Sequence, residues 1–140
     1  MGLIGAITMA VFYKLYQDNR KNGTRRYYAR PVALNVVDTN MLADRIQVKC
    51  TLHKSDILAC IAALVEEMRT ELCNSNIVKL DGFGIFKASL KSTGADDPKL
   101  FNVSENIQGV KVNFLPSGHK SQNGKITRDM LDGVTVKKYE

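Results

Sequence analysis

The stretch from Ser55 to Lys91 constrains the fold more than any other part of the chain. In its first half, apolar residues recur at steps of three and four, which places them on one stripe of an α-helix: Ile57, Leu58, Ile61, Leu64, Val65, Met68 and Leu72. In its second half the period changes to two, and Gly82 and Gly84 supply the conformations that a tight connection between strands needs. The stretch therefore predicts a long amphipathic helix followed by a β-hairpin, and the helix needs a surface that covers its apolar stripe.

The length of the chain allows one domain with extensions. Its 140 residues, 44% of them hydrophobic, suffice for one domain with a core, and two full domains would be cramped. We therefore expect a β-hairpin extension over residues 1–37, a central domain over 38–120, and a helical turn and strand over 121–140.

The net charge of +6 is unevenly distributed along the chain. Residues 1–37 carry six basic residues and one acidic residue, whereas residues 38–77 carry four basic and six acidic residues. The basic character therefore lies in the flanks and not in the helical centre. A basic balance favours anionic partners such as nucleic acid, although many basic proteins are merely soluble.

The N-terminal extension combines basic and aromatic residues in a hairpin pattern around an Asn22-Gly23 turn signal. Pro31 cannot donate to a ladder, so the second arm is expected at a sheet edge or broken there. The basic residues and their aromatic neighbours are Arg20, Lys21, Arg25, Arg26, Tyr27, Tyr28 and Arg30. Such a cluster suits phosphate contact and base stacking. The alternative is a solvated turn whose tyrosines pack on the core.

Two shorter helical signals flank the long helix pattern. Residues 38–40 offer side-chain oxygens that can cap a short helix, whose buried face would carry Leu42 and Ile46. His53 stands just before the long helix, so we interpret it as a residue of the cap region and not as a catalytic one. Near the C-terminus, residues 128–132 are expected to form a short helical turn.

Motifs for catalysis, metal binding and membrane insertion are missing from the sequence. It contains two histidines, and no Gly-x-Ser-x-Gly, Walker or His-Glu-x-x-His pattern occurs. Cys50, Cys60 and Cys73 form no Cys-x-x-Cys pair, so we expect free thiols in a reducing compartment. Residues 1–13 are apolar but too few to span a bilayer. We therefore expect no enzyme activity, metal, cofactor, small-molecule substrate or membrane association.

The order of short helix, long helix, strand, glycine turn and strand resembles the bacterial HU/IHF histone-like DNA-binding family. The segment Gly82-Phe83-Gly84-Ile85-Phe86 is similar to the family's Gly-Phe-Gly-(Thr)-Phe, and residues 114–120 are similar to its Phe-Lys-Pro-Gly-Lys. The resemblance covers residues 38–91 and 110–120, roughly half of the chain. The added N-terminal hairpin and the lack of a long basic arm resemble a variant branch of HU-like proteins.

The resemblance implies an α+β fold of the HU/IHF type. It consists of two N-terminal helices followed by a three-stranded antiparallel sheet, here with an added N-terminal β-hairpin and a short C-terminal helix and strand. The resemblance also implies an intertwined homodimer with one shared core, which would explain the apolar stripe of the long helix.

The family bends DNA with two basic β-arms, each of which wedges a proline between base steps. The corresponding segment here is residues 94–99, in which Asp96 and Asp97 precede Pro98. Because these aspartates would repel phosphates, we assign no intercalating role to Pro98.

The DNA contacts that remain come from the hairpin and from the body of the central domain. They are Arg25, Arg26 and Arg30 of the hairpin, Lys87, Lys91 and Lys111 of the sheet, and Lys120, which matches the family's lysine after Pro-Gly. For each lysine taken alone, a solvated surface charge is the alternative.

These observations predict a sequence-nonspecific, nucleoid-associated protein that acts as a homodimer on double-stranded DNA in the bacterial cytoplasm. Phosphate contacts would supply its affinity. The alternative is an HU-like dimerisation or protein-interaction module that has lost DNA bending. The acidic Asp96-Asp97 pair and the apolar start at Leu3-Ile4 favour this alternative.

Overall fold

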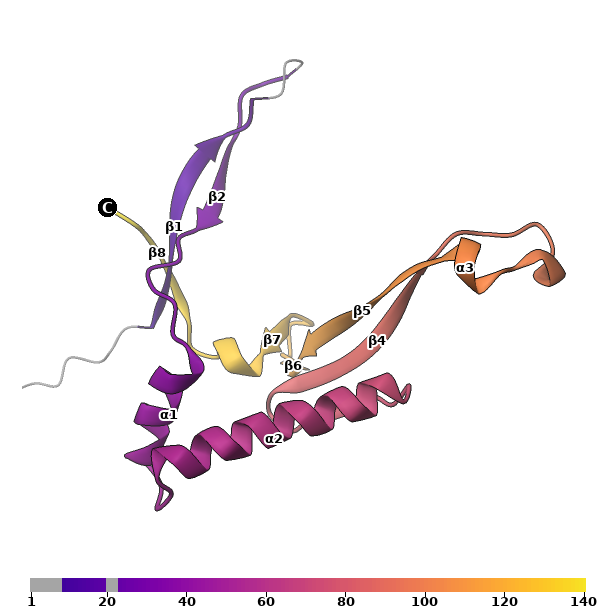
Figure 1. The fold of residues 1–140 in the computed structure, drawn as a ribbon. Coiled ribbons are helices and arrows are strands. Elements are labelled where there is room, and N and C mark those ends of the chain that lie inside the picture. The colour runs from indigo at the N-terminus through magenta and orange to yellow at the C-terminus, as the bar shows by residue number, and fades with distance from the viewer. Residues whose placement is uncertain (1–8, 20–22) are drawn as a thin grey trace, which may run out of the picture. The chain divides into compact units, whose positions relative to one another are not determined.

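The structure, a computed structural model, describes residues 9–19 and 23–140 (Figure 1). Arg20 and Lys21 of the predicted basic hairpin and the apolar start of the chain lie outside the described residues. The chain divides into two compact units, which we describe separately. The first unit comprises residues 1–38 and 131–140, and the second unit comprises residues 39–130.

The first unit is a three-stranded sheet with the strand order β2-β1-β8. Its strands are β1 (Ala10–Gln17), β2 (Tyr27–Pro31) and β8 (Thr135–Lys138). β1 pairs antiparallel with β2 and parallel with β8. Pro31 lies in an edge strand, where the missing amide hydrogen costs least. The amide of Asp18 donates to the carbonyl of Arg26 at 2.8 Å, which joins the chain on either side of the β1–β2 connection.

The second unit begins with two helices, α1 (Thr39–Gln47) and α2 (Lys54–Cys73). His53 is the N-cap residue of α2, and its amide donates to the Asp56 carboxylate at 3.3 Å. The carboxylate also lies near the positive end of the helix dipole, where a negative charge is stabilising. His53 therefore lies in the cap region, where the sequence interpretation placed it.

A second three-stranded sheet follows α2, with the strand order β3-β4-β5. Its strands are β3 (Val78–Leu80), β4 (Gly84–Ser92) and β5 (Ile107–Pro116), and both pairs are antiparallel. Gly84 has φ +154°, and a Cβ atom there would lie 2.6 Å from Cε2 of Phe114 and collide with the carbonyl oxygen of Leu115. The glycine is required because the turn from β3 passes so close to β5.

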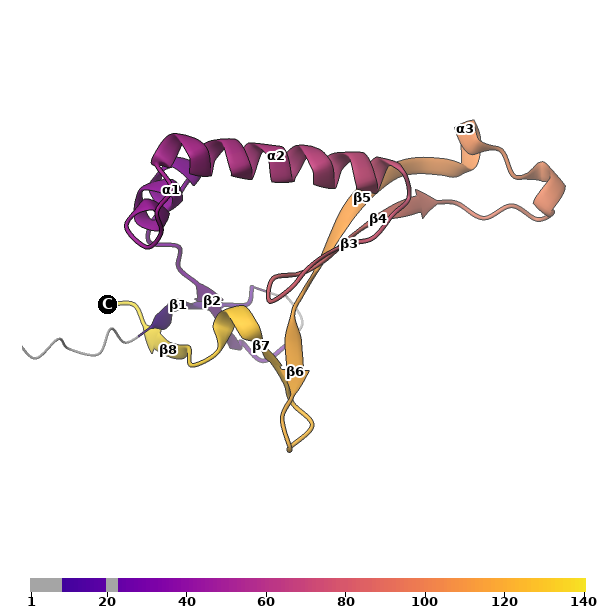
Figure 2. The ribbon, with the colours of Figure 1, turned by 90° about the horizontal axis from the view of Figure 1, so that it is seen from below.

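The connection between β4 and β5 holds two short helical turns, η1 (Pro98–Leu100) and α3 (Val103–Asn106). Figure 2 shows β4 and β5 continuing past the C-terminal end of α2 towards α3. After β5, the hairpin of β6 (Gly118–Lys120) and β7 (Ile126–Arg128) leads into the turn η2 (Asp129–Leu131).

The fold predicted from the sequence is wrong. Within the described residues the chain is mixed α/β and mostly β, with three α-helices and eight strands. It is not the arrangement of two helices, a three-stranded sheet and an added N-terminal hairpin. The predicted hairpin belongs to a sheet that β8 completes from the other end of the chain, and residues 118–128 form a further two-stranded sheet.

The apolar residues of the second unit are poorly covered. Among the described residues, Ala43 and Ile57 are the buried hydrophobic ones. Leu64 and Val65 on α2 are 44% and 60% exposed, and Leu90, Val110 and Val112 on the sheet are also exposed. A helix with this apolar stripe is therefore incompletely buried by its own chain. No helix in the described part of the chain has the length and apolar character to cross a membrane.

Candidate nucleic-acid interface

One face of the β3-β4-β5 sheet gathers lysines. In the antiparallel register, Lys87, Ser89 and Lys91 of β4 lie opposite Asn113, Lys111 and Gly109 of β5. Directly opposed residues of paired strands share a face. Lys79 of β3 lies opposite Ile85 and so joins the same face. We call Lys79, Lys87, Lys91 and Lys111 the lysine face.

The lysine face has a uniform sign of charge. All four lysines are exposed, and none of the paired positions on this side of the sheet carries an acidic residue. Alternate residues of a strand lie about 7 Å apart, which is within the Debye length of about 8 Å at physiological salt. The fields of neighbouring lysines therefore add, and an extended polyanion can satisfy several of them at once.

The opposite face of the same sheet is apolar and faces α2. It carries Phe86, Ala88, Leu90, Val110, Val112 and Phe114. The rings of Phe86 and Phe114 stack with their centroids 4.7 Å apart, and Phe83 lies 5.5 Å from Phe114. This division explains how a short sheet can pack and also present charge.

An open groove runs between this apolar face and the C-terminal half of α2. It consists of a hollow of about 720 Å³ and a hollow of about 300 Å³, and Leu72, Cys73 and Val112 line both. Val65 and Met68 line the smaller hollow, whereas the lining of the larger one also includes Lys87. We call this surface the apolar groove.

The structure places the remaining predicted contacts elsewhere. Lys120 lies in β6 opposite Ile126, in the two-stranded β6–β7 sheet. Arg25 and Arg26 precede β2, and Arg30 lies within β2, so all three belong to the first unit. The structure therefore brings Lys87, Lys91 and Lys111 together on one face. It does not place the three arginines or Lys120 on that face.

Lys79 is a member of the lysine face that sequence reasoning missed. The signal was present, because Lys79 alternates with Val78 and Leu80 and so points away from the apolar side of β3. The strand of three residues was predicted as the first arm of the hairpin, but Lys79 was not assigned as a contact.

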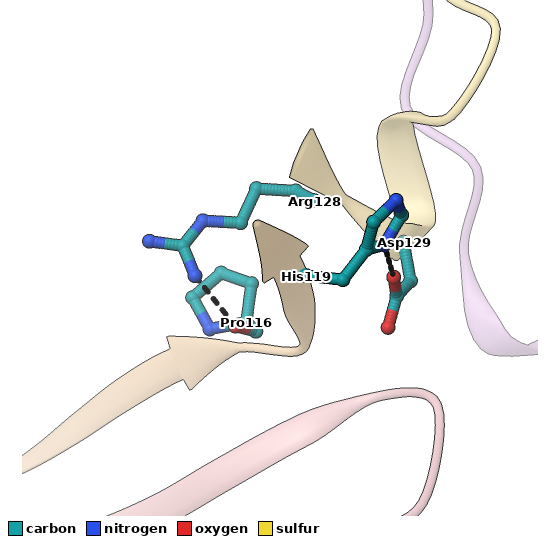
Figure 3. Close-up of polar contacts among 4 residues, drawn as sticks. All are labelled: Pro116, His119, Arg128 and Asp129. Carbon is teal, nitrogen blue, oxygen red and sulfur yellow. Dashed lines mark hydrogen bonds and ion pairs between the residues drawn. The ribbon is translucent and has the colours of Figure 1, made fainter. Parts of the chain in front are cut away.

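The β6–β7 hairpin is held by polar contacts that Figure 3 shows. Arg128 reaches from β7 and donates through Nη1 to the carbonyl of Pro116 at 2.9 Å. His119 Nδ1 lies 3.0 Å from Asp129 Oδ1, and both side chains are exposed. The Arg128 contact ties β7 to the end of β5, whereas the exposed His119–Asp129 pair adds little. Arg128 therefore has a structural role, which the sequence pattern did not indicate.

Asp97, in the segment where the family carries a basic arm, has a structural role. Its carboxylate accepts from the amide of Lys99 at 2.9 Å and so caps η1. Asn102 accepts in the same way from the amide of Ser104 at 2.9 Å and caps α3. The connection between β4 and β5 is therefore built from caps and short turns.

In residues 9–19 and 23–140, no group of three or more His, Cys, Asp or Glu side chains could hold a metal ion. Cys50, Cys60 and Cys73 are exposed free thiols.

Comparison with known proteins adds one match. Residues 9–131 match the family model HU-HIG, which is described as an HU domain fused to a wHTH, Ig or glycine-rich motif. The matched range contains the β1–β2 strands as well as the lysine face. None of the curated proteins matches the chain.

Proposed function

Because this chain belongs to the HU-HIG family of HU domains fused to a wHTH, Ig or glycine-rich motif, we propose that it is a nucleoid-associated protein. It binds double-stranded DNA without sequence preference. The observation that carries the proposal is the lysine face, an exposed cationic strip without an acidic residue at its paired positions. Lysines there neutralise phosphates and release counterions, which gives affinity without base readout.

The proposed protein acts as a homodimer in the bacterial cytoplasm. The apolar groove supports the homodimer. Full burial of a Val or Leu side chain contributes about 1.5 to 3 kcal/mol, so the exposed Val65 and Val112 leave stabilisation unused in a single chain. A second copy that covers the groove would recover it. The lysine face lies on the other side of the same sheet, so dimerisation through the groove leaves most of it open to DNA.

We assign the chain to a variant HU-like branch without a long basic arm. Asp97 and Asn102 cap the two turns between β4 and β5, and the two aspartates at 96 and 97 weaken attraction to phosphate. DNA contact therefore depends on the body of the sheet, and the proposed function includes no catalytic step and no cofactor.

The experiment compares two variants that each remove two positive charges. Lys91→Gln/Lys111→Gln alters the lysine face, whereas Lys49→Gln/Lys125→Gln alters two lysines outside it. At ~100 mM salt we expect the first variant to bind a mixed-sequence duplex about tenfold more weakly, with a salt slope smaller by about 2 for each lysine face that contacts the duplex. We expect the second variant to bind almost as the unmodified chain does. Equal losses in both variants would show that only net charge matters and would refute the lysine face as the site.

A protein-interaction module that has lost DNA bending is the second candidate function. The apolar groove favours it, because an exposed apolar surface of this kind is typical of a protein contact. The two candidates separate in the same titration. The second one predicts no duplex binding even at ~50 mM salt, where a phosphate-driven contact is strongest.

A further inference from the structure

The sheet of the first unit has a face on which cations and aromatic rings alternate. In the β1–β2 register, Lys14 lies opposite Arg30 and Tyr16 lies opposite Tyr28. The parallel β1–β8 register adds Phe12 opposite Lys137 on the same side. Tyr139, just after β8, packs its ring edge-to-face against Phe12 at 6.1 Å. We call Lys14, Tyr16, Tyr28, Arg30 and Tyr139 the cation–aromatic face.

The cations of this face are positioned by the rings. Lys14 Nζ lies 4.9 Å from the ring centroid of Tyr139, and Arg30 Cζ lies 5.1 Å from that of Tyr16. Both distances are within the range of cation–π attraction. The rings remain accessible, since Tyr16, Tyr28 and Tyr139 are 45%, 50% and 40% exposed. Arg30 covers one face of the Tyr16 ring, and the exposed remainder of the rings is the surface on which a further flat group can pack.

The register also places two cations opposite each other. Lys14 and Arg30 face each other directly across the strands, and like charges in this position repel. An anion between them would relieve the repulsion. A hollow of about 250 Å³ opens beside Arg30, and Tyr16, Tyr28, Arg30, Gln17 and Asp18 line it, whereas Lys14 lies outside its lining. It is smaller than the sites of about 300 to 1,000 Å³ that hold drug-sized ligands, so it suits one flat group.

We propose that the cation–aromatic face binds single-stranded DNA. Bases stack on Tyr16 and Tyr28, and the backbone phosphates contact Lys14 and Arg30. A ligand for this face must offer flat rings and negative charges in alternation, as an unpaired nucleic-acid strand does. In a duplex the bases stack on one another, and their faces are unavailable to a sheet. The carboxylate of Asp18 also lines the hollow and weakens the attraction to phosphate there, so the phosphate contacts depend on Lys14 and Arg30.

The tyrosines of the chain provide a fluorescence signal for binding at this site. All five tyrosines, at positions 13, 16, 27, 28 and 139, belong to the first unit, and the chain has no tryptophan. Base stacking on Tyr16 and Tyr28 should therefore quench the tyrosine fluorescence of the unmodified full-length chain. An oligothymidylate of about 15 nucleotides is a suitable ligand, because single-strand sites of this kind span about 4 to 16 nucleotides. Binding without quenching would overturn the proposal.

Two matched double variants test the rings. Tyr16→Leu/Tyr28→Leu removes both π-faces, whereas Tyr16→Phe/Tyr28→Phe retains them and removes only the hydroxyl groups. Measured by fluorescence anisotropy of a labelled oligothymidylate, the Leu variant should bind about tenfold more weakly for each lost ring. The Phe variant should stay within about twofold, since stacking needs the ring alone. Equal affinity of the Leu variant and the unmodified chain, or an equal loss in both variants, would overturn the proposal.

Three further ligands separate stacking from other binding. An abasic strand of the same length keeps the phosphates but has no bases. If it binds as tightly as oligothymidylate does, the affinity comes from charge alone, which would overturn the proposal. An oligouridylate bound more tightly than oligothymidylate would overturn the assignment to DNA.

Duplex DNA should bind equally to the Leu variant and the unmodified chain, because the lysine face is intact. A loss there would overturn the independence of this site. Failure at the tyrosines with duplex binding retained refutes this inference and leaves the proposed function standing.

Discussion

The two three-stranded sheets of this chain both present a cationic face, but their cations have different neighbours. On the β3-β4-β5 sheet the lysines alternate with small polar residues such as Ser89 and Asn113, and the aromatic rings lie on the opposite face. On the β2-β1-β8 sheet, Lys14 and Arg30 lie against tyrosine rings. Free lysines suit a line of phosphates, whereas cations beside exposed rings suit phosphates and bases together.

The sharpest way to separate the two sheets is to destabilise one of them. In Gly84→Ala the new Cβ would collide with the backbone of Leu115 and the ring of Phe114 at a φ of +154°. We expect the second unit to lose about 3 kcal/mol of unfolding free energy. Gly109→Ala is the matched control, because nothing lies within 4 Å of its added Cβ.

Denaturant titration measures this loss of stability when unfolding is followed by two signals. Circular dichroism reports both units, whereas tyrosine fluorescence reports the first unit alone. The expected outcome for Gly84→Ala is an earlier circular dichroism transition and an unchanged tyrosine transition. A tyrosine transition that shifts by the same amount would show that the two sheets unfold as one cooperative body.

A second prediction concerns what covers the apolar side of the lysine-bearing sheet. In Val112→Glu a carboxylate enters both hollows of the apolar groove. Since burial of an unpaired charge is costly, we expect the dimer dissociation constant to rise at least about tenfold, as measured by analytical ultracentrifugation. Val136→Glu, on the exposed β8 of the other sheet, is the control. Unaltered self-association in Val112→Glu would exclude the groove as the dimer contact.

A smaller effect is expected where caps replace the family's arm. Asn102 Oδ1 accepts from the amide and the hydroxyl of Ser104 at 2.9 and 2.7 Å. Asn102→Ala should therefore lower the unfolding free energy of the second unit by about 1 kcal/mol and leave duplex affinity nearly unchanged. A large loss of duplex binding would show that this connection, and not the lysine face, contacts DNA.

The smallest effect is expected at the exposed pair of His119 and Asp129. An exposed pair of this kind contributes at most about 1 kcal/mol, so His119→Gln should leave stability and both nucleic-acid affinities almost unaltered. Thermal unfolding and the two binding titrations check this. A loss of several kcal/mol would mean that the β6–β7 hairpin depends on this pair more than its exposure suggests.

Local features of the fold could be predicted from the sequence. The helical period from Ser55 onwards indicated α2, and Gly82 and Gly84 indicated the connection between β3 and β4. Both signals depend on residues close together in the chain. The pairing of Ala10 with Thr135 joins opposite ends of the chain, and no local period specifies such a partner. The predicted fold class was wrong for this reason.

The candidate interface was predicted in part from the sequence. Lys87, Lys91 and Lys111 were predicted as contacts of the sheet, and the strand register places all three on one face. Lys79 was missed although its strand was predicted as an arm of the hairpin. Tyr139 was also missed, because its contacts with Phe12 and Lys14 follow from the same long-range pairing that the sequence could not reveal.

Salt dependence of duplex binding by the unmodified chain tests the central claim most directly. If the four lysines of the lysine face neutralise phosphates, log K should fall against log salt with a slope of about −3.6 for one face and about twice that for a dimer using both. Binding that is absent at ~50 mM salt, or that shows no dependence on salt, would contradict DNA binding by phosphate neutralisation.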